Sequence, residues 1–264
     1  MRGACTFPRN ILGTPSHSAS RLRTLHLVFL PLGTDHLSSA RRRRIIVVPV
    51  LLALNVLTYA TAFWGAGRGF WSVGGFYQKL ALDWDGFVWW NMFSYQFLHD
   101  PNGMWHLLGN MFFLWTFGLA AEARVGRVRF LLAYLLGGAL AGVAQIAVSH
   151  GSVIGASGSV STVAGLFIAL FPGARIYGLS LIGLGMVAIP ASFFIILYVA
   201  IDLVDALLDL TGIRRSSIGN FAHLAGMALA TTPLVHPLKL KTLACLQLMS
   251  DPMWLLVVNS TSSA

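Results

Sequence analysis

One stretch of the chain decides the fold, and over residues 155–173 it reads GASGSVSTVAGLFIALFPG. Residues 157–171 carry no charge, and the proline and glycine that follow them are typical of a helix end. Ser157, Ser161 and Gly165 recur at intervals of four, so they share one face of the expected helix. Small residues on one face allow a second helix to approach closely inside a membrane. We therefore expect a buried membrane helix that begins at a serine.

Uncharged apolar runs of similar length occur on both sides of this stretch. A membrane-spanning helix needs about 20 mostly apolar residues, in a range of roughly 17 to 25. The runs near that size are residues 45–63, 105–121, 128–148, 157–171, 187–208 and 218–235. The chain has 264 residues, of which 56% are hydrophobic and only 10% charged, whereas a soluble domain has about 25% charged residues. The sequence predicts an all-α polytopic membrane protein whose core, residues 45–236, is a bundle of six transmembrane helices in a lipid bilayer.

Positive charge is concentrated before the first run. The chain has 18 Lys and Arg against 9 Asp and Glu, a formal net charge of +9. We expect residues 1–44 to form a basic, disordered cytoplasmic leader, although their Arg-rich, acid-poor composition also resembles a mitochondrial transit peptide. Residues 237–264 are expected to form a cytoplasmic tail. With the N-terminus in the cytoplasm, most Lys and Arg near the runs lie inside, so the second, fourth and sixth runs all lead from outside to inside.

Three features are not expected in this chain: a metal site, a disulfide framework and a nucleic-acid interface. Its two cysteines, Cys5 and Cys245, lie in opposite terminal segments, and neither has a second Cys or a His at metal-ligand spacing. The sequence therefore predicts no metal site and no disulfide framework. The core has no basic stripe interleaved with aromatic residues, so nucleic acid is not an expected partner.

Polar residues inside the runs fall at matching depth. Such residues are costly in a membrane, and each is therefore a candidate for function. His106 and Asn110 lie near the outer end of the second run, Ser157 opens the fourth, and His223 lies in the first part of the sixth. Three runs with the same direction would bring a hydroxyl, two imidazoles and a carboxamide to one buried layer.

The types of these residues indicate nucleophilic chemistry. Glycines flank Ser157 in Gly155-Ala156-Ser157-Gly158, where the backbone can approach a ligand and a helix start offers free N–H groups. His223 is the expected general base, because a serine hydroxyl is a weak nucleophile without a proton acceptor. His106 and Asn110 lie one helical turn apart and suit a developing oxyanion. Gly226 shares a face with His223 and would allow close helix contact.

Each residue also has a plainer interpretation. Ser157 could be a helix cap, and His223 could form an interhelical hydrogen bond. His106 and Asn110 could be an interfacial histidine and a packing asparagine. We favour the catalytic interpretation, because four plain roles would have to coincide in depth and direction.

Two further groups of charged residues lie at helix ends. The fifth run ends with three acidic residues on one face: Asp202, Asp205 and Asp209. They could line a wet cavity, pair with Arg214 and Arg215, or form an ordinary solvated helix end, and we favour the last. Glu122 and Arg124 end the second run and predict a structural polar cluster.

The polar residues together resemble the motifs of the rhomboid family of intramembrane serine proteases. The matching motifs are His106-x-x-x-Asn110, Gly155-Ala156-Ser157-Gly158, Ala222-His223-x-x-Gly226 and Ala121-Glu122-Ala123-Arg124, within about residues 45–235. The resemblance implies a six-helix rhomboid-like bundle with a water-filled cavity open to the outside. It implies a catalytic dyad of Ser157 and His223 without a third acidic member, and an oxyanion hole from His106, Asn110 and the Ser157 backbone.

The resemblance also implies an activity, that of a serine-type endopeptidase. Its substrates would be single-pass membrane proteins cut in or near their transmembrane segment, and it would use no cofactor. The alternative is a catalytically silent rhomboid-like protein that binds or traffics clients, or a small transporter. We expect a bacterial inner membrane, because the additional spanning helix common in mitochondrial rhomboids is missing, and keep the mitochondrial inner membrane as the alternative.

Three positions depart from the family pattern. Asn91 follows Trp90 where many members have arginine, so this chain lacks the family's usual Trp-Arg pair in the first outer loop. Ser161 stands where some bacterial members have an aromatic residue against which the histidine packs. Ala230 replaces the last glycine of the motif around His223, which should preserve close approach of the helices.

Overall fold

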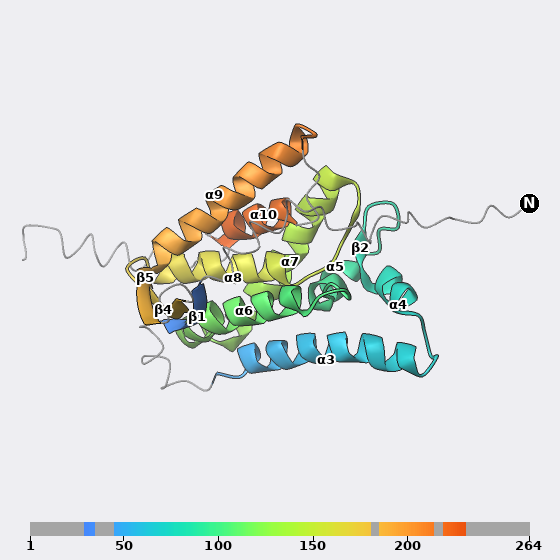
Figure 1. Ribbon diagram of the computed structural model, residues 1–264, viewed down its shortest axis with the longest axis horizontal. Coiled ribbons are helices and arrows are strands. Elements are labelled where there is room, and N and C mark those ends of the chain that lie inside the picture. The colour runs from blue at the N-terminus through green and yellow to red at the C-terminus, as the bar shows by residue number, and fades with distance from the viewer. Residues whose placement is uncertain (1–28, 35–44, 181–184, 214–218, 231–264) are drawn as a thin grey trace, which may run out of the picture.

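The computed structural model describes residues 29–34, 45–180, 185–213 and 219–230, and these are mostly helical (Figure 1). Each of the six predicted runs overlaps one described helix. These helices are α3 (Val47–Gly67), α6 (Met104–Val125), α7 (Arg127–Ser149), α8 (Ser157–Leu170), α9 (Ala191–Leu210) and α10 (Asn220–Ala230). Three of them, α3, α7 and α9, are long and apolar enough to cross a membrane, and α8 is a shorter apolar helix.

The three long helices expose large apolar side chains on their outer faces. Leu57 of α3, Leu132 of α7 and Ile196 of α9 are 60%, 50% and 67% exposed. Extended apolar surface of this kind is unfavourable in water and favourable against lipid. These helices and their surfaces are those of an integral membrane protein.

Helix α8 occupies the centre of the bundle and packs against α6, α7 and α10 (Figure 1). All its residues from Gly158 to Phe167 are buried. The ring of Phe167 packs on that of Phe117 from α6, with centroids 5.2 Å apart. The prediction that this run forms a buried helix beginning at Ser157 is confirmed.

A small antiparallel sheet departs from the all-α prediction. Its strands are β1 (Phe29–Thr34), β4 (Arg175–Ser180) and β5 (Gly185–Pro190), in the order β1-β4-β5. The sheet lies at the end of the bundle where α9 begins (Figure 1). The prediction of a disordered leader is therefore wrong for residues 29–34, whose backbone pairs with β4. The rest of the leader and the tail lie outside the described residues.

The same sheet corrects the start of the fifth run. The prediction placed a helix from Val187, but Val187 pairs with Gly178 of β4, and α9 begins after Pro190. The residue before a proline favours extended backbone, and proline has no N–H to continue a helical ladder from the preceding turn. A short apolar run does not by itself distinguish strand from helix.

The connection between α3 and α6 is well structured. It contains α4 (Val73–Leu80), β2 (Leu82–Asp83), α5 (Asn91–Ser94) and the 3₁₀ helix η2 (Tyr95–Phe97), and β2 pairs with β3 (Ser152–Val153) just before α8. Asn91 is buried, and its side-chain amide donates to the carbonyl of Ala81 at 2.8 Å. The asparagine that replaces the family's arginine thus anchors this loop by a buried hydrogen bond.

Of the two residues expected to form a polar cluster at the end of α6, Glu122 is buried and hydrogen-bonded, whereas Arg124 is exposed. The Glu122 carboxylate accepts hydrogen bonds from the backbone N–H groups of Ile46, Val47 and Val48 at 2.8 to 2.9 Å. These N–H groups begin α3 and have no partner within the helix, so the carboxylate both satisfies them and complements the helix dipole. Glu122 therefore joins the end of α6 to the start of α3.

Candidate active site

Ser157 is the first residue of α8, and Gly155, two residues before it, has a backbone conformation that favours glycine. Gly155 has a φ of +124°, a conformation that residues with a Cβ rarely adopt. Its N–H donates to the carbonyl of Tyr95 at 3.0 Å, which ties the loop to η2. Ser157 is only half-buried, so its hydroxyl remains accessible at the N-terminus of an otherwise buried helix.

His106 lies on the other side of Gly155. A Cβ placed on Gly155 would lie 3.0 Å from His106 Nε2 and 3.7 Å from Ser157 Oγ, so this glycine lets the imidazole and the hydroxyl share one small space. The backbone N–H of Asp100 donates to His106 Nδ1 at 3.4 Å. Neutral His106 therefore has its proton on Nε2 and directs an N–H donor into that space.

Asn110 lies one turn further along α6 and is buried. Its side-chain N–H₂ donates to the carbonyl of His106 at 2.9 Å. One amide proton is used in this bond and the other remains available, since a carboxamide has two donors. His106 and Asn110 thus lie one turn apart on the same helix, α6, as predicted.

His99 is a buried neighbour that the sequence analysis did not single out. Its ring packs against that of His106, with centroids 5.2 Å apart and an interplanar angle of 60°. Burial, reinforced by the nearby His106, lowers the pKa of His99 to about 3. His99 is therefore uncharged at neutral pH and places no positive charge beside His106.

His223 lies in the first turn of α10 and contacts two residues of α9. Its Nδ1 is 3.1 Å from Oδ2 and 3.2 Å from Oδ1 of Asp202, and 2.9 Å from the hydroxyl of Tyr198. The rings of Tyr198 and His223 lie 5.7 Å apart at 30°. An aromatic residue therefore packs on the histidine although position 161 is a serine, and it comes from α9 instead of α8.

The acidic face of α9 is not the solvated helix end that the sequence analysis favoured. Asp202 and Asp205 are only 5% and 6% exposed, and Asp202 pairs with His223. Arg214 and Arg215, the other partners considered, lie outside the described residues.

Helices α8 and α10 meet at glycines, as predicted from the small residues on their faces. A Cβ on Gly226 would collide with the carbonyl oxygen of Gly158 and would lie 3.0 Å from Thr162 Oγ1. Further along, a Cβ on Gly165 would lie 2.8 Å from that of Ala230. The helices thus run in the same direction, with the turn that carries His223 beside the turn that begins at Ser157.

The described side-chain hydrogen bonds of His223 all involve its Nδ1, and within this part of the chain none joins His223 to Ser157. Catalytic hydrogen bonds in substrate-free enzymes are often long and shorten in the complex with substrate. The geometry brings the two residues onto adjacent helix turns and leaves Nε2 of His223 available for the hydroxyl.

A family model of the rhomboid domain matches residues 86–235, which is more than half of the chain. The chain belongs to the rhomboid family. A search among curated proteins finds no match to it. The matched region contains all four residues predicted for the site, Ser157, His223, His106 and Asn110, together with Tyr198 and Asp202.

Hydrogen bonds from neighbouring elements hold the segments around Ser157 and His223 in this rhomboid. Gln96 of η2 accepts from Ser159 Oγ at 2.8 Å and donates to the carbonyl of Leu135 on α7. Gln145 of α7 accepts from the backbone N–H of Ala222 at 3.1 Å and so caps the start of α10. The helices that carry Ser157 and His223 are therefore both fixed to α7.

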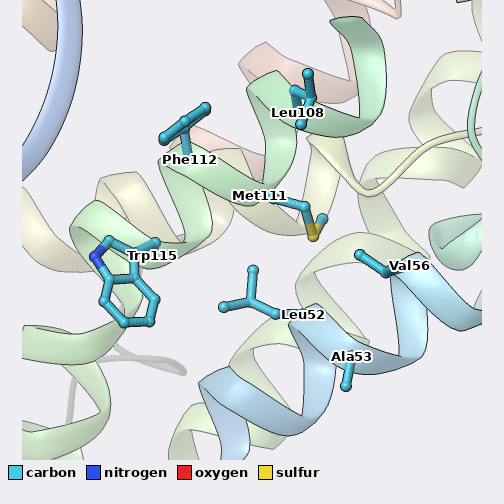
Figure 2. Close-up of a pocket in the computed structure, with 7 residues that line it drawn as sticks. All are labelled: Leu52, Ala53, Val56, Leu108, Met111, Phe112 and Trp115. Atoms are coloured by element: carbon cyan, nitrogen blue, oxygen red, sulfur yellow. The ribbon is translucent and has the colours of Figure 1, made fainter. Parts of the chain in front are cut away.

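A pocket of the rhomboid lies away from these residues. Figure 2 shows it between α3 and α6. Its volume is about 500 Å³, and it is lined by Leu52, Ala53, Val56, Leu108, Met111, Phe112 and Trp115. These residues of α6 lie on the face opposite His106 and Asn110, and they include no titratable group. Among the described residues, moreover, no group of three His, Cys, Asp or Glu could hold a metal ion.

The contact at Gly226 gives a direct test of the packing. Leucine at this position would force α10 away from the Gly158 carbonyl, and overpacking of this kind costs about 1 to 3 kcal/mol. We expect Gly226→Leu to lower the thermal unfolding temperature of the detergent-solubilised protein. The matched control is Gly109→Leu, because a Cβ on Gly109 meets nothing within 4 Å. Equal stability of the two variants would show that α8 and α10 do not meet at Gly226.

Proposed function

We propose that this rhomboid is a serine-type endopeptidase that cleaves single-pass membrane proteins in or near their transmembrane segment. The observation that carries the proposal is the complementary arrangement of two imidazoles near Ser157. His106 directs an N–H toward the space beside the hydroxyl, since its Nδ1 accepts from the backbone. His223 keeps Nε2 as an acceptor, since its Nδ1 faces a carboxylate. One imidazole thus serves as a donor and the other as a base, as acyl transfer requires.

The proposed reaction follows the usual course of acyl transfer. Ser157 Oγ attacks the carbonyl carbon of the scissile peptide while His223 Nε2 takes the hydroxyl proton. The carbonyl oxygen becomes an oxyanion, to which His106 Nε2–H, the Asn110 amide and the backbone N–H of Ser157 donate. His223 then protonates the leaving amine, and water hydrolyses the acyl-enzyme with His223 as the base. Gly155, Gly158 and Gly226 support the site by allowing close approach.

The surroundings of the site favour a substrate that is itself in the membrane. Ser157 begins a buried helix inside a bundle whose outer faces are apolar. A transmembrane segment can reach such a site by moving laterally through the lipid, so transmembrane proteins are the proposed partners. In the proposed topology six helices cross the membrane, the N-terminus is cytoplasmic, and Ser157 opens to the outer side. The proposed location is a bacterial inner membrane, with the mitochondrial inner membrane as the alternative.

Replacement of the nucleophile tests the proposal. We expect Ser157→Ala to abolish cleavage of a reporter with one transmembrane segment in proteoliposomes, because the substitution removes the attacking oxygen and little volume. His223→Ala should be nearly as severe, and the double variant no worse, because nucleophile and base act as a unit. The matched control is Ser152→Ala, the same change at an exposed position, which should retain activity. Cleavage at the wild-type rate by Ser157→Ala would leave a silent client-binding protein or a transporter as the explanation.

The oxyanion donors give a second prediction, on turnover. We expect His106→Ala and Asn110→Ala each to lower kcat by up to about 10²- to 10³-fold with KM little changed, because the donors act mainly in the transition state. The measurement is the kcat and KM of reporter cleavage in proteoliposomes. Asn102→Ala, in the exposed loop before α6, is the control. A rise in KM with unchanged kcat would assign the residue to substrate docking instead.

A further inference from the structure

We propose that Asp202 of α9 is a positioning residue for His223, so that the site is a Ser157–His223–Asp202 array. This inference rests on the proposed protease function and deepens it. The rhomboid resemblance implies only the serine and the histidine, and the sequence gives no direct sign of a third member.

The side chains of His223 and Asp202 lie within hydrogen-bond distance of each other. Both carboxylate oxygens of Asp202 lie 3.1 to 3.2 Å from Nδ1 of His223. The aspartate is 5% and the histidine 6% exposed. In a site that excludes water, a hydrogen bond to a charged group is stronger than at the surface. The pair therefore holds the imidazole in one orientation relative to α9.

The carboxylate also determines which nitrogen of His223 has the proton. An ionised carboxylate only accepts hydrogen bonds, so the nitrogen that faces it must have the N–H. Nε2 is then left with its lone pair, which is the form that can take a proton from a serine hydroxyl. An acidic residue in this relation to a catalytic histidine fixes its tautomer and stabilises the imidazolium that forms during the reaction.

Tyr198 completes the support of the histidine. It lies four residues before Asp202, one turn of α9, and the two side chains reach the same Nδ1 atom. Its ring centroid lies 5.7 Å from that of the imidazole, and its hydroxyl is 2.9 Å from Nδ1, so the contact limits rotation of the histidine. The base on α10 is therefore oriented by α9, whereas the nucleophile is fixed by α7 and η2.

A purely structural role for Asp202 makes a different prediction. If the pair only joins α9 to α10, its loss should lower stability and leave kcat near the wild-type value once the protein is folded. Asp205 provides the comparison, because it is equally buried on the same helix and has interactions of its own. Asp205→Asn makes the same chemical change about one helical turn after Asp202.

The experiment measures kcat, KM and unfolding temperature of the full-length protein in proteoliposomes with the transmembrane reporter. We expect Asp202→Asn to lower kcat by about 10²- to 10⁴-fold with KM changed less than about threefold, because the amide permits the wrong tautomer. Asp202→Glu keeps the carboxylate and should have a kcat between those of Asp202→Asn and the wild type. Asp205→Asn should keep kcat within about threefold of the wild type.

The possible outcomes distinguish failure of the role of Asp202 from failure of the proposed protease function. Cleavage that depends on Ser157 but has the same kcat in Asp202→Asn as in Asp205→Asn would overturn the role of Asp202 alone. Absence of any Ser157-dependent cleavage in the wild type would overturn the protease function and this inference with it. If Asp202→Asn does not fold, Asp202→Ser, which also removes the carboxylate, decides: a kcat at least about tenfold below the wild type with unchanged KM supports the role, and an unchanged kcat overturns it.

Discussion

The close contact between α8 and α10 is the constraint on which the site depends. Gly226 lies against the carbonyl of Gly158 and against Thr162, with no space for a side chain of its own. Any larger residue there would separate the turn that begins at Ser157 from the turn that contains His223. Because lipid provides no hydrophobic drive between helices, close packing of small residues is the main force that holds such a pair together.

The rest of the bundle fixes the ends of these two helices. Gln145 of α7 caps α10 through the N–H of Ala222, while Tyr95 and Gln96 hold the residues around Ser157. The connection between α3 and α6 contributes as well, since η2 within it is bonded directly to the loop before Ser157. In the same way, Glu122 fixes α3 to the end of α6.

The sequence predicted the helices well because their defining signal is local. An uncharged run of about 20 residues has few alternatives in a membrane, so each of the six runs overlaps a helix among the described residues. The strands were missed for the opposite reason. Residues 185–190 are as apolar as the helix that follows, and only pairing with β4, which depends on the rest of the fold, makes them extended. The backbone pairing of residues 29–34 is likewise a long-range contact.

The four polar residues of the predicted site could be found because each stands out within an apolar run. Asp202 could not, because it lies in a group of three aspartates near a helix end, where charged residues are ordinary. Its partner was decided by how α9 packs against α10, and nothing in the spacing of residues along the chain records that. Tyr198 was missed for a related reason, since the resemblance directed attention to position 161 of α8.

The central claim is that the fold activates one serine hydroxyl, and covalent labelling tests it most directly. The wild-type protein in proteoliposomes would be treated with a serine-directed fluorophosphonate, and the modified residue located by peptide mass spectrometry. The account predicts an adduct on Ser157, with neighbouring Ser159 and Ser161 unmodified and labelling lost in His223→Ala. Unlabelled protein, or labelling of Ser157 that is equally fast without His223, would contradict it.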